Sequence, residues 1–142
     1  MSREEQIKSL VTDYYAKMDA LQGDFTKMSE VFNEHMIFHF PGVPGPMNVE
    51  EFQGPAQGIY AGFSDFRHTI EDFIIDDNKV ACRVNINGTH DGNFQGIPAT
   101  NKSIAISGIT IFRIDNNKLS EHWVSVDMMG LMVQIGAIPT EA

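Results

Sequence analysis

The sequence predicts an α+β fold in which helices pack on one face of a curved antiparallel sheet. Two observations lead to this prediction. Apolar residues recur at helical spacing through much of the first 63 residues, whereas they alternate with a period of two from residue 66. The later segments are joined by short polar turns, and consecutive hairpins form an antiparallel sheet. With 142 residues, of which 42% are hydrophobic, the chain has the size of one domain with a core, and we expect that domain to cover residues 1–142.

The N-terminal segment 2–21 is expected to form an amphipathic helix. Its apolar residues follow helical spacing. Ser2 with Glu5 has the form of a capping box, which satisfies backbone N–H groups at the start of a helix. A second short helix is expected at 25–34, and a short strand is expected at 35–40.

A broken helix is expected from about residue 49 to about residue 63. Asn48 stands where such a helix would start, and Gly54-Pro55 interrupts it because proline suits the first position of a new turn. Near the end of the chain, segment 128–135 is expected to form a short apolar helix, which a glycine and then a proline end.

Four long strands are expected after residue 65, at 66–76, 79–90, 103–115 and 118–127. The joints at 76–78 and 115–117 are rich in Asp and Asn, which tolerate positive φ angles and favour hairpin turns. The middle connection is longer and rich in glycine. These joints make the four strands consecutive neighbours in one sheet.

The third of these strands carries apolar residues on both faces. Ile104, Ile106 and Phe112 fall on one face, and Ala105, Ile109 and Ile111 fall on the other. A sheet with one face in water normally shows polar residues there. We therefore expect the second face to be covered by another subunit in a homodimer.

Composition and charge exclude several classes of function. The net charge of −9 argues against nucleic-acid binding, which needs a basic surface. No apolar run reaches the roughly 18 residues of a membrane span, and the charged N-terminus does not resemble a signal peptide. The lone Cys82 cannot form an internal disulfide. These features indicate a cytoplasmic protein that does not bind membranes.

Several motifs in the second half of the chain resemble those of a known family. They are Gly88-Thr89-His90, Gly96-Ile97-Pro98-Ala99-Thr100, Glu121-x-Trp123-x-x-x-Asp127 and Gln134-Ile135-Gly136, with Phe63-Ser64-Asp65-Phe66 before them. They resemble the SnoaL-like polyketide cyclase family of the nuclear transport factor 2 superfamily. The resemblance covers most of the chain and implies a cone-shaped α+β domain. Asn101 departs from the glycine common at that position, which should alter only a loop. The family is functionally mixed, so the resemblance bears on fold more than on reaction.

The resemblance implies a catalytic role for Asp127. In the characterised cyclases of this family, the Asp of the Trp-x-x-x-Asp element is the general acid and base of an intramolecular aldol ring closure, without metal or cofactor. Strand alternation places Asp127 on the face of Trp123, and apolar residues follow it, so we expect its carboxylate to point into an apolar pocket. The alternative is that Asp127 only caps the last helix, and the two roles are compatible.

Four histidines, His39, His68, His90 and His122, are further titratable candidates. None of their spacings matches a metal-binding motif such as HExxH, so we expect no metal. The family resemblance implies that no cofactor is needed. His39 is expected at the pocket mouth, where it would bond a substrate carbonyl, or it is an ordinary strand histidine. His90 would bind substrate or fix a turn. His122 is expected outside the pocket, because it alternates with Trp123.

Four other residues are candidates for contact with substrate. Arg83 is expected to be buried and paired with Glu121 or Asp127, because a buried guanidinium needs a carboxylate. Trp123 would stack on a flat ligand or belong to the core. Tyr15 would donate a hydrogen bond to an enolate oxygen, or it too is a core residue.

The sequence therefore favours a cofactor-free enzyme of cyclase or isomerase type that acts on a small, apolar, carbonyl-bearing molecule. The alternatives are a non-catalytic protein that binds such a ligand, a scaffold that recruits a partner through its sheet, and an enzyme resembling ketosteroid isomerases or epoxide hydrolases. A deep pocket with Asp127 at its floor would favour the enzyme. A filled cone would favour the scaffold.

Overall fold

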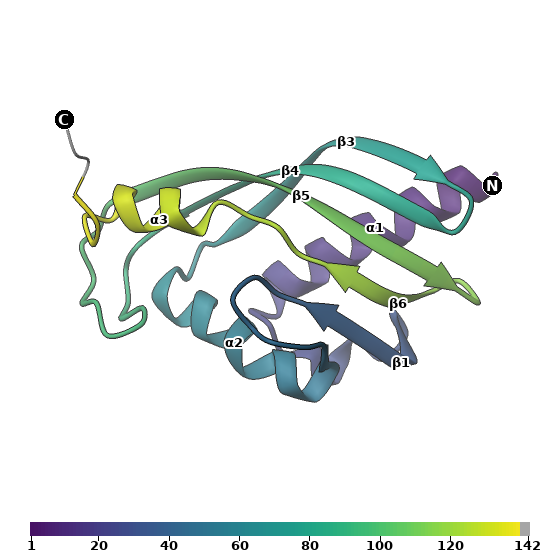
Figure 1. Ribbon diagram of the computed structural model, residues 1–142, viewed down its shortest axis with the longest axis horizontal. Helices are drawn as coiled ribbons and strands as arrows, with labels where there is room; N and C mark the ends of the chain where they lie inside the picture. The colour runs from purple at the N-terminus through teal and green to yellow at the C-terminus, as the bar shows by residue number, and fades with distance from the viewer. Residues whose placement is uncertain (140–142) are drawn as a thin grey trace.

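The computed structural model describes residues 1–139, which form helices and one sheet (Figure 1). The elements are α1 (Arg3–Ala20), the 3-10 helix η1 (Phe25–Lys27), β1 (Phe32–His39), β2 (Met47–Asn48), α2 (Val49–Gly62), β3 (Arg67–Asp76), β4 (Lys79–Thr89), β5 (Ser103–Asp115), β6 (Lys118–Trp123) and α3 (Met128–Gln134). The predicted α+β architecture is confirmed.

Within the described residues, six strands form one curved sheet in the order β2-β1-β6-β5-β4-β3. The neighbours from β3 to β6 are antiparallel, as expected for consecutive hairpins. β1 pairs with β6 in parallel, so the sheet is mixed rather than entirely antiparallel. Helices α1 and α2 cover one face of the sheet, and α3 packs against β5 (Figure 1). The space between these two helices and the sheet is where a site can form.

Local chemistry at the element ends matches the sequence. The Ser2 hydroxyl accepts a hydrogen bond from the Glu5 backbone, and the Glu5 carboxylate accepts one from the Ser2 backbone, so the predicted capping box starts α1. Asp77 in one hairpin turn, and Asn116 and Asn117 in the other, have positive φ angles. The two predicted hairpins are confirmed.

The segment 25–34 does not form the short helix that we expected. Only η1 is helical there, and β1 already starts at Phe32. From Phe32 onward the side chains of Phe32, Met36 and Phe38 are buried against the helices. Because these side chains are buried when the segment is extended, a strand is favoured here over the short helix that the sequence spacing suggested.

Helix α2 is continuous, so the prediction of a helix broken at Gly54-Pro55 is wrong. Pro55 lies inside the helix and cannot donate the hydrogen bond of its turn, which costs about 3 kcal/mol. The neighbouring turns bury Phe52, Ala56 and Tyr60 against the core, and this burial offsets the loss.

A β-bulge in β6 determines which side chains face the helices. Ile114 of β5 pairs with Leu119 and Arg113 pairs with Glu121, so Ser120 is an extra residue between two pairs. The extra residue reverses the alternation beyond it. Leu119 is therefore buried under the helices, but Glu121 faces outward. Strict alternation along this strand would have placed these two residues on one face.

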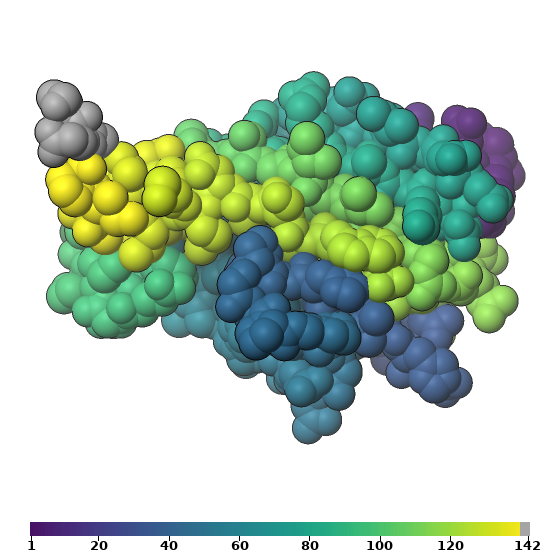
Figure 2. Space-filling model, in the orientation of Figure 1, coloured from purple at the N-terminus to yellow at the C-terminus, as the bar shows by residue number. Residues whose placement is uncertain are grey.

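The outer face of the sheet is partly apolar, as we expected. Ile109 is 59% exposed, Ile111 is 38% exposed and Ile74 is 69% exposed. Strands β5 and β6 and helix α3 lie at the surface in Figure 2. Among residues 1–139, no helix is both long and apolar enough to cross a membrane.

Candidate functional site

A small cavity lies between the helices and the inner face of the sheet, and we call it the cone cavity. Its volume is about 40 Å³, which holds only a few water molecules. Its apolar lining comprises Met18, Phe40, Phe52, Ile59, Phe66, Val84, Ile86, Val124, Val126 and Met128, and its polar lining comprises Tyr14, Tyr15, His68, Thr110 and His122. The interior of the cone is thus nearly filled by side chains.

A second hollow, which we call the vestibule, adjoins the cone cavity. Its volume is about 210 Å³, and its lining residues are Phe40, Pro55, Gly58, Ile59, Phe94, Gln95 and Met128. Phe40, Ile59 and Met128 line both spaces. These three side chains therefore form the wall between the vestibule and the cone cavity.

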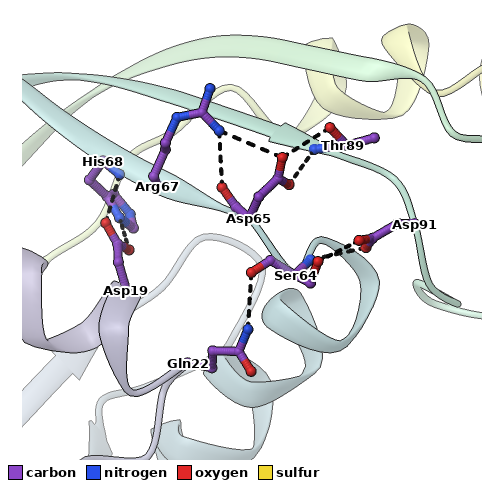
Figure 3. Close-up of polar contacts among 8 residues, drawn as sticks. All are labelled: Asp19, Gln22, Ser64, Asp65, Arg67, His68, Thr89 and Asp91. Carbon is purple, nitrogen blue, oxygen red and sulfur yellow. Dashed lines mark hydrogen bonds and ion pairs between the residues drawn. The ribbon is translucent and has the colours of Figure 1, made fainter.

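His68 of β3 and Asp19 of α1 form a buried pair at the edge of the cone cavity (Figure 3). Asp19 Oδ1 lies 2.8 Å from His68 Nδ1, and Oδ2 accepts a hydrogen bond from the His68 backbone N–H at 2.9 Å. The Tyr60 hydroxyl donates a third hydrogen bond to Asp19, at 2.5 Å. The His68 side chain is 8% exposed and that of Asp19 is 19% exposed. Three hydrogen bonds thus satisfy a carboxylate that is largely removed from water.

Tyr15 lies next to this pair and also lines the cone cavity. Its ring stacks on the His68 ring with centroids 4.5 Å apart. Its hydroxyl is 2.9 Å from the Thr110 hydroxyl. Burial raises the pKa of Tyr15 well above its ordinary value, so the phenol keeps its proton. The predicted place of Tyr15 in the pocket agrees with the structure.

His122 is a cavity residue, contrary to the expectation that it lies outside. Its side chain is buried and stacks on Phe112 with ring centroids 3.9 Å apart. Neither ring nitrogen has a hydrogen-bond partner within residues 1–139. Burial lowers the pKa of His122 to about 3, with smaller contributions from His68 and His39. The imidazole is therefore neutral at physiological pH.

The structure brings three predicted site residues together, but on the outer face of the sheet. His39 Nε2 is 2.6 Å from Glu121 Oε2, and the His39 ring stacks on Trp123 with centroids 5.2 Å apart. Arg113 donates a hydrogen bond to Glu121 at 3.2 Å, and the Lys79 ammonium lies 5.7 Å from the Trp123 ring. His39, Glu121 and Trp123 line neither the cone cavity nor the vestibule. The expected place of His39 at the pocket mouth is wrong.

Asp127 is the N-cap of α3. Its carboxylate accepts a hydrogen bond from the Gly130 backbone N–H at 2.8 Å. The side chain is exposed and borders an outer-face hollow with Asn85 and Ser107, whereas the flanking Val126 and Met128 line the cone cavity. The cap interpretation is confirmed, and the expected orientation into an apolar cavity is wrong. A catalytic role of Asp127 stays a prediction.

Arg83 is exposed, and it forms no ion pair with any residue from 1 to 139. The prediction of a buried Arg83 paired with a carboxylate is wrong. Alternation in β4 explains the difference, because Cys82 and Val84 on either side of it are buried against the helices. A charged residue on the outward positions of this strand remains in water.

His90 is fully buried at the end of β4, and it fixes the following loop. Its Nδ1 accepts a hydrogen bond from the Thr100 backbone N–H at 3.3 Å and lies 2.9 Å from the Thr100 hydroxyl. Its ring stacks on Phe63 with centroids 5.1 Å apart. The interpretation as a turn-fixing residue is confirmed. His90 does not line the cone cavity.

Sequence reasoning named His68 only as a titratable candidate and missed Asp19, Tyr60 and Thr110. A signal for Asp19 was present, because this carboxylate follows Tyr15 by four residues and Met18 by one, on the apolar stripe of the first helix. An acid on such a stripe needs a buried partner. No three His, Cys, Asp or Glu side chains within residues 1–139 gather as possible metal ligands.

The chain is similar to proteins of a known family. Residues 12–135 match the model of the SnoaL-like polyketide cyclase family. The chain is 28% identical over 109 residues to the aklanonic acid methyl ester cyclase DnrD of Streptomyces peucetius, covering 75% of this chain and 72% of that protein. It is 28% identical over 111 residues to the cyclase DauD of Streptomyces sp. (strain C5), covering 77% of this chain and 66% of that protein.

Solved structures share the fold. AclR from Streptomyces galilaeus, a candidate hydroxylase, has a TM-score of 0.85 at 20% identity, covering 99% of this chain and 87% of that chain. IdmH from Streptomyces antibioticus, a candidate polyketide cyclase, has a TM-score of 0.80 at 24% identity, covering 91% of this chain and 97% of that chain. The family match over most of the chain, together with this fold, means that the protein belongs to the SnoaL-like polyketide cyclase family.

Proposed function

We propose that the protein is a cofactor-free enzyme that closes a ring in a small polyketide-type ester carrying ketone groups. The observation that carries the proposal is the chemistry of the cone cavity. Its lining is apolar except for hydroxyl and imidazole groups, which bind and move protons. Membership of the SnoaL-like polyketide cyclase family supports the proposed reaction class.

The reaction is an intramolecular aldol addition. A carbon between two carbonyl groups loses a proton, and its electron pair attacks the ketone carbon of the same molecule. The new carbon–carbon bond leaves an alkoxide, which takes back one proton, so the product has the mass of the substrate. An apolar cavity suits this chemistry, because hydrogen bonds to a developing enolate are stronger there than in water.

A substrate with several rings needs more room than the cone cavity offers in this structure. The vestibule is the adjoining space, and Phe40, Ile59 and Met128 stand between the two. Met128 follows the cap residue of a seven-residue helix, and a methionine side chain adapts readily to a ligand. In the proposal, these three side chains move apart when substrate enters from the vestibule.

Asp127 keeps in the proposal the acid and base role that the family resemblance implies. Its carboxylate is held by Gly130 at the start of α3, and Met128 beside it lines both the cavity and the vestibule. The role therefore requires the carboxylate to leave its cap position when substrate displaces Met128.

Two observations favour a second candidate, a non-catalytic protein that recruits a partner. The cone is nearly filled, and Ile74 and Ile109 on the outer face are exposed. A scaffold of this kind would use the sheet surface and would leave the cavity unoccupied. The same assay separates the two candidates.

The test uses aklanonic acid methyl ester, the compound for which the two similar cyclases are named. Purified protein is incubated with this ester, and the mixture is separated by liquid chromatography with mass detection. We expect a product of unchanged mass and new retention time, formed faster than in buffer. A steroid with an isomerisable double bond and a small epoxide are run in parallel. Turnover of one of these instead of the ester would replace ring closure by isomerase or hydrolase activity, and no turnover of any would favour the scaffold.

A further inference from the structure

We propose that His68 is a general base of the cone cavity and that Asp19 positions it. This inference rests on the proposed function, because a base is required only when a proton leaves a carbon of the substrate. It adds to that function a pair of residues that the family motifs in the sequence do not include. Five observations on these residues and their neighbours support it.

The first observation is the state of the His68 ring. Asp19 Oδ1 is 2.8 Å from His68 Nδ1. An ionised carboxylate only accepts hydrogen bonds, so in the proposal Nδ1 carries the hydrogen of this contact and Nε2 carries the lone pair. Nε2 forms no hydrogen bond with any residue from 1 to 139. The lone pair is therefore available to receive a proton.

The second observation is how firmly Asp19 is held. Its Oδ2 accepts a hydrogen bond from the His68 backbone, and its Oδ1 accepts one from the Tyr60 hydroxyl. These contacts come from β3 and α2, so three elements fix the carboxylate behind the imidazole. A carboxylate in this position stabilises the imidazolium that forms when the ring takes up a proton.

The third observation separates His68 from the other cavity histidine. His122 also lines the cone cavity, but neither of its nitrogens has a partner within residues 1–139, and no carboxylate accepts from its ring. Its low pKa follows from burial and means that its imidazolium is strongly disfavoured. Of the two rings, only His68 has a group that stabilises the protonated form.

The fourth observation separates His68 from His39, which also has a carboxylate partner. His39 also bonds a carboxylate, that of Glu121, at 2.6 Å. Its side chain is 34% exposed on the outer face, whereas that of His68 is 8% exposed and lines the cavity. Hydrogen bonds to charged groups are stronger where water is excluded. The inner pair is therefore the one suited to proton transfer on an apolar substrate.

The fifth observation is a hydrogen-bond donor beside the base. The Tyr15 and Thr110 hydroxyls lie 2.9 Å apart and share one hydrogen bond. Two hydroxyl groups carry two hydrogens, so one hydrogen remains for a third partner. Tyr15 stacks on His68, which places this donor next to the base. In the reaction, Nε2 takes the proton from the carbon, the hydroxyl pair binds the enolate oxygen, and Asp127 gives a proton to the alkoxide. The imidazolium then releases its proton to water and Asp127 takes one up, so both groups return to their starting states.

The experiment follows proton removal separately from ring closure. The probe for removal is 2-tetralone in D₂O, whose carbon-bound hydrogens exchange only after deprotonation, and proton NMR measures the rate. Ring closure is measured with aklanonic acid methyl ester. The variants are His68→Gln and Asp19→Asn, and the control is His35→Gln, whose side chain is 86% exposed and does not line the cavity.

We expect His68→Gln to lower both rates by about 100-fold or more with an unchanged KM, and His35→Gln to leave them unchanged. Asp19→Asn should lower kcat by about 10-fold. Nitrogen-15 NMR of the His68 imidazole provides a second readout, because it reports whether Asp19 sets the tautomer of the ring. We expect Nδ1 to carry the hydrogen in the wild type, and Asp19→Asn to produce both tautomers. If circular dichroism shows that His68→Gln does not fold, the kcat of Asp19→Asn and the His68 tautomer in that variant test the inference instead.

The outcomes distinguish the inference from the function on which it rests. Ring closure by the wild type with full activity in His68→Gln would overturn the inference and leave the proposed function standing. Exchange of 2-tetralone that depends on His68, without ring closure, would support the base and overturn the proposed reaction. A wild type that neither exchanges the probe nor closes the ring would overturn both.

Discussion

At the start of α3, the Asp127 carboxylate accepts a hydrogen bond from the Gly130 backbone at 2.8 Å. Asp127→Asn tests whether this residue does more than cap the helix. Asparagine is as good an N-cap as aspartate, so the free energy of unfolding should change little. Asparagine cannot exchange a proton, so ring closure should slow by roughly two to four orders of magnitude.

The measurement is the rate of ring closure beside a denaturant titration of the same variant. Asp127→Ala is the matched control, because it removes both the cap and the proton and should also lower stability by about 1 kcal/mol. Wild-type turnover in Asp127→Asn would reduce Asp127 to a helix cap.

His122 makes the stability of the fold sensitive to acid. Its pKa is about 3 in the folded protein and 6.5 ordinarily, because burial disfavours the charged ring. Below pH 6.5 the unfolded chain binds a proton that the folded chain does not. The contribution of His122 to the free energy of unfolding is therefore fully present above pH 6.5. As the pH falls from 6.5 toward 3, this free energy decreases by about 1 kcal/mol for each pH unit.

His122→Phe removes this proton while keeping a flat ring against Phe112. We expect the variant to be at least as stable as the wild type at pH 7, since both nitrogens of His122 lack partners within residues 1–139. Between pH 6.5 and 4 it should lose less stability than the wild type in urea titrations. If both proteins lost the same free energy of unfolding over this pH range, His122 would take up its proton in the folded state, and its pKa would not be lowered.

At the scale of elements, α2 and the start of α3 border both the vestibule and the cone cavity. Ile59 of α2 lies between the vestibule and the cavity. Ile59→Trp should fill this passage and lower kcat/KM for the ester by about 10-fold or more, because a substrate misplaced by about 1 Å loses up to 100-fold in rate. Exchange of the smaller 2-tetralone should fall less.

Steady-state kinetics with both probes provide the measurement for Ile59→Trp. Val43→Trp, which places the same side chain at a residue 40% exposed, is the control for added bulk. Equal rates for Ile59→Trp and the wild type would show that substrate reaches the cavity by another path.

The positions of most elements could be predicted from the sequence, but the orientation of one strand could not. The strand at 103–115 and both hairpin turns follow from alternation and from Asp and Asn at the turns. In β6, one extra residue at Ser120 turns His122 inward and Glu121 outward. A bulge depends on how two strands pair, and no period within one strand contains that information.

The candidate site was predictable in part for a similar reason. The family motif led to Asp127 and Trp123, which the structure places outside the cone cavity. Asp19 and His68 lie on a helix and a strand that meet only in the folded chain. Their pairing is a tertiary contact across 49 residues, and neither local spacing nor composition predicts it.

For the whole molecule, the exposed apolar face of the sheet predicts association into a homodimer. Ile109 and Ile111 lie on this face, and burying them against a second copy would remove apolar surface from water. Light scattering at micromolar concentration should give twice the chain mass of 15.9 kDa. Ile109→Arg should shift the protein toward the monomer, because an unpaired charge in such an interface is costly.

Val43→Arg is the control, since Val43 is exposed in the loop between β1 and β2 and not on this face. A wild type of 15.9 kDa at this concentration would exclude the dimer, and the outer isoleucines would then be available to another partner.

The parallel pairing of β1 with β6 has a consequence for how the chain folds. His39, near the start of the chain, takes Trp123 as its partner in the sheet, so β1 cannot be completed until nearly the whole chain has been synthesised. The hairpins from β3 to β5 need only their own neighbours and can form earlier. Contacts between distant parts of a sequence slow folding. Until β6 arrives, Phe32 and Phe38 of β1 have no sheet to pack beside, and during this interval the nascent protein is most exposed to aggregation and proteolysis.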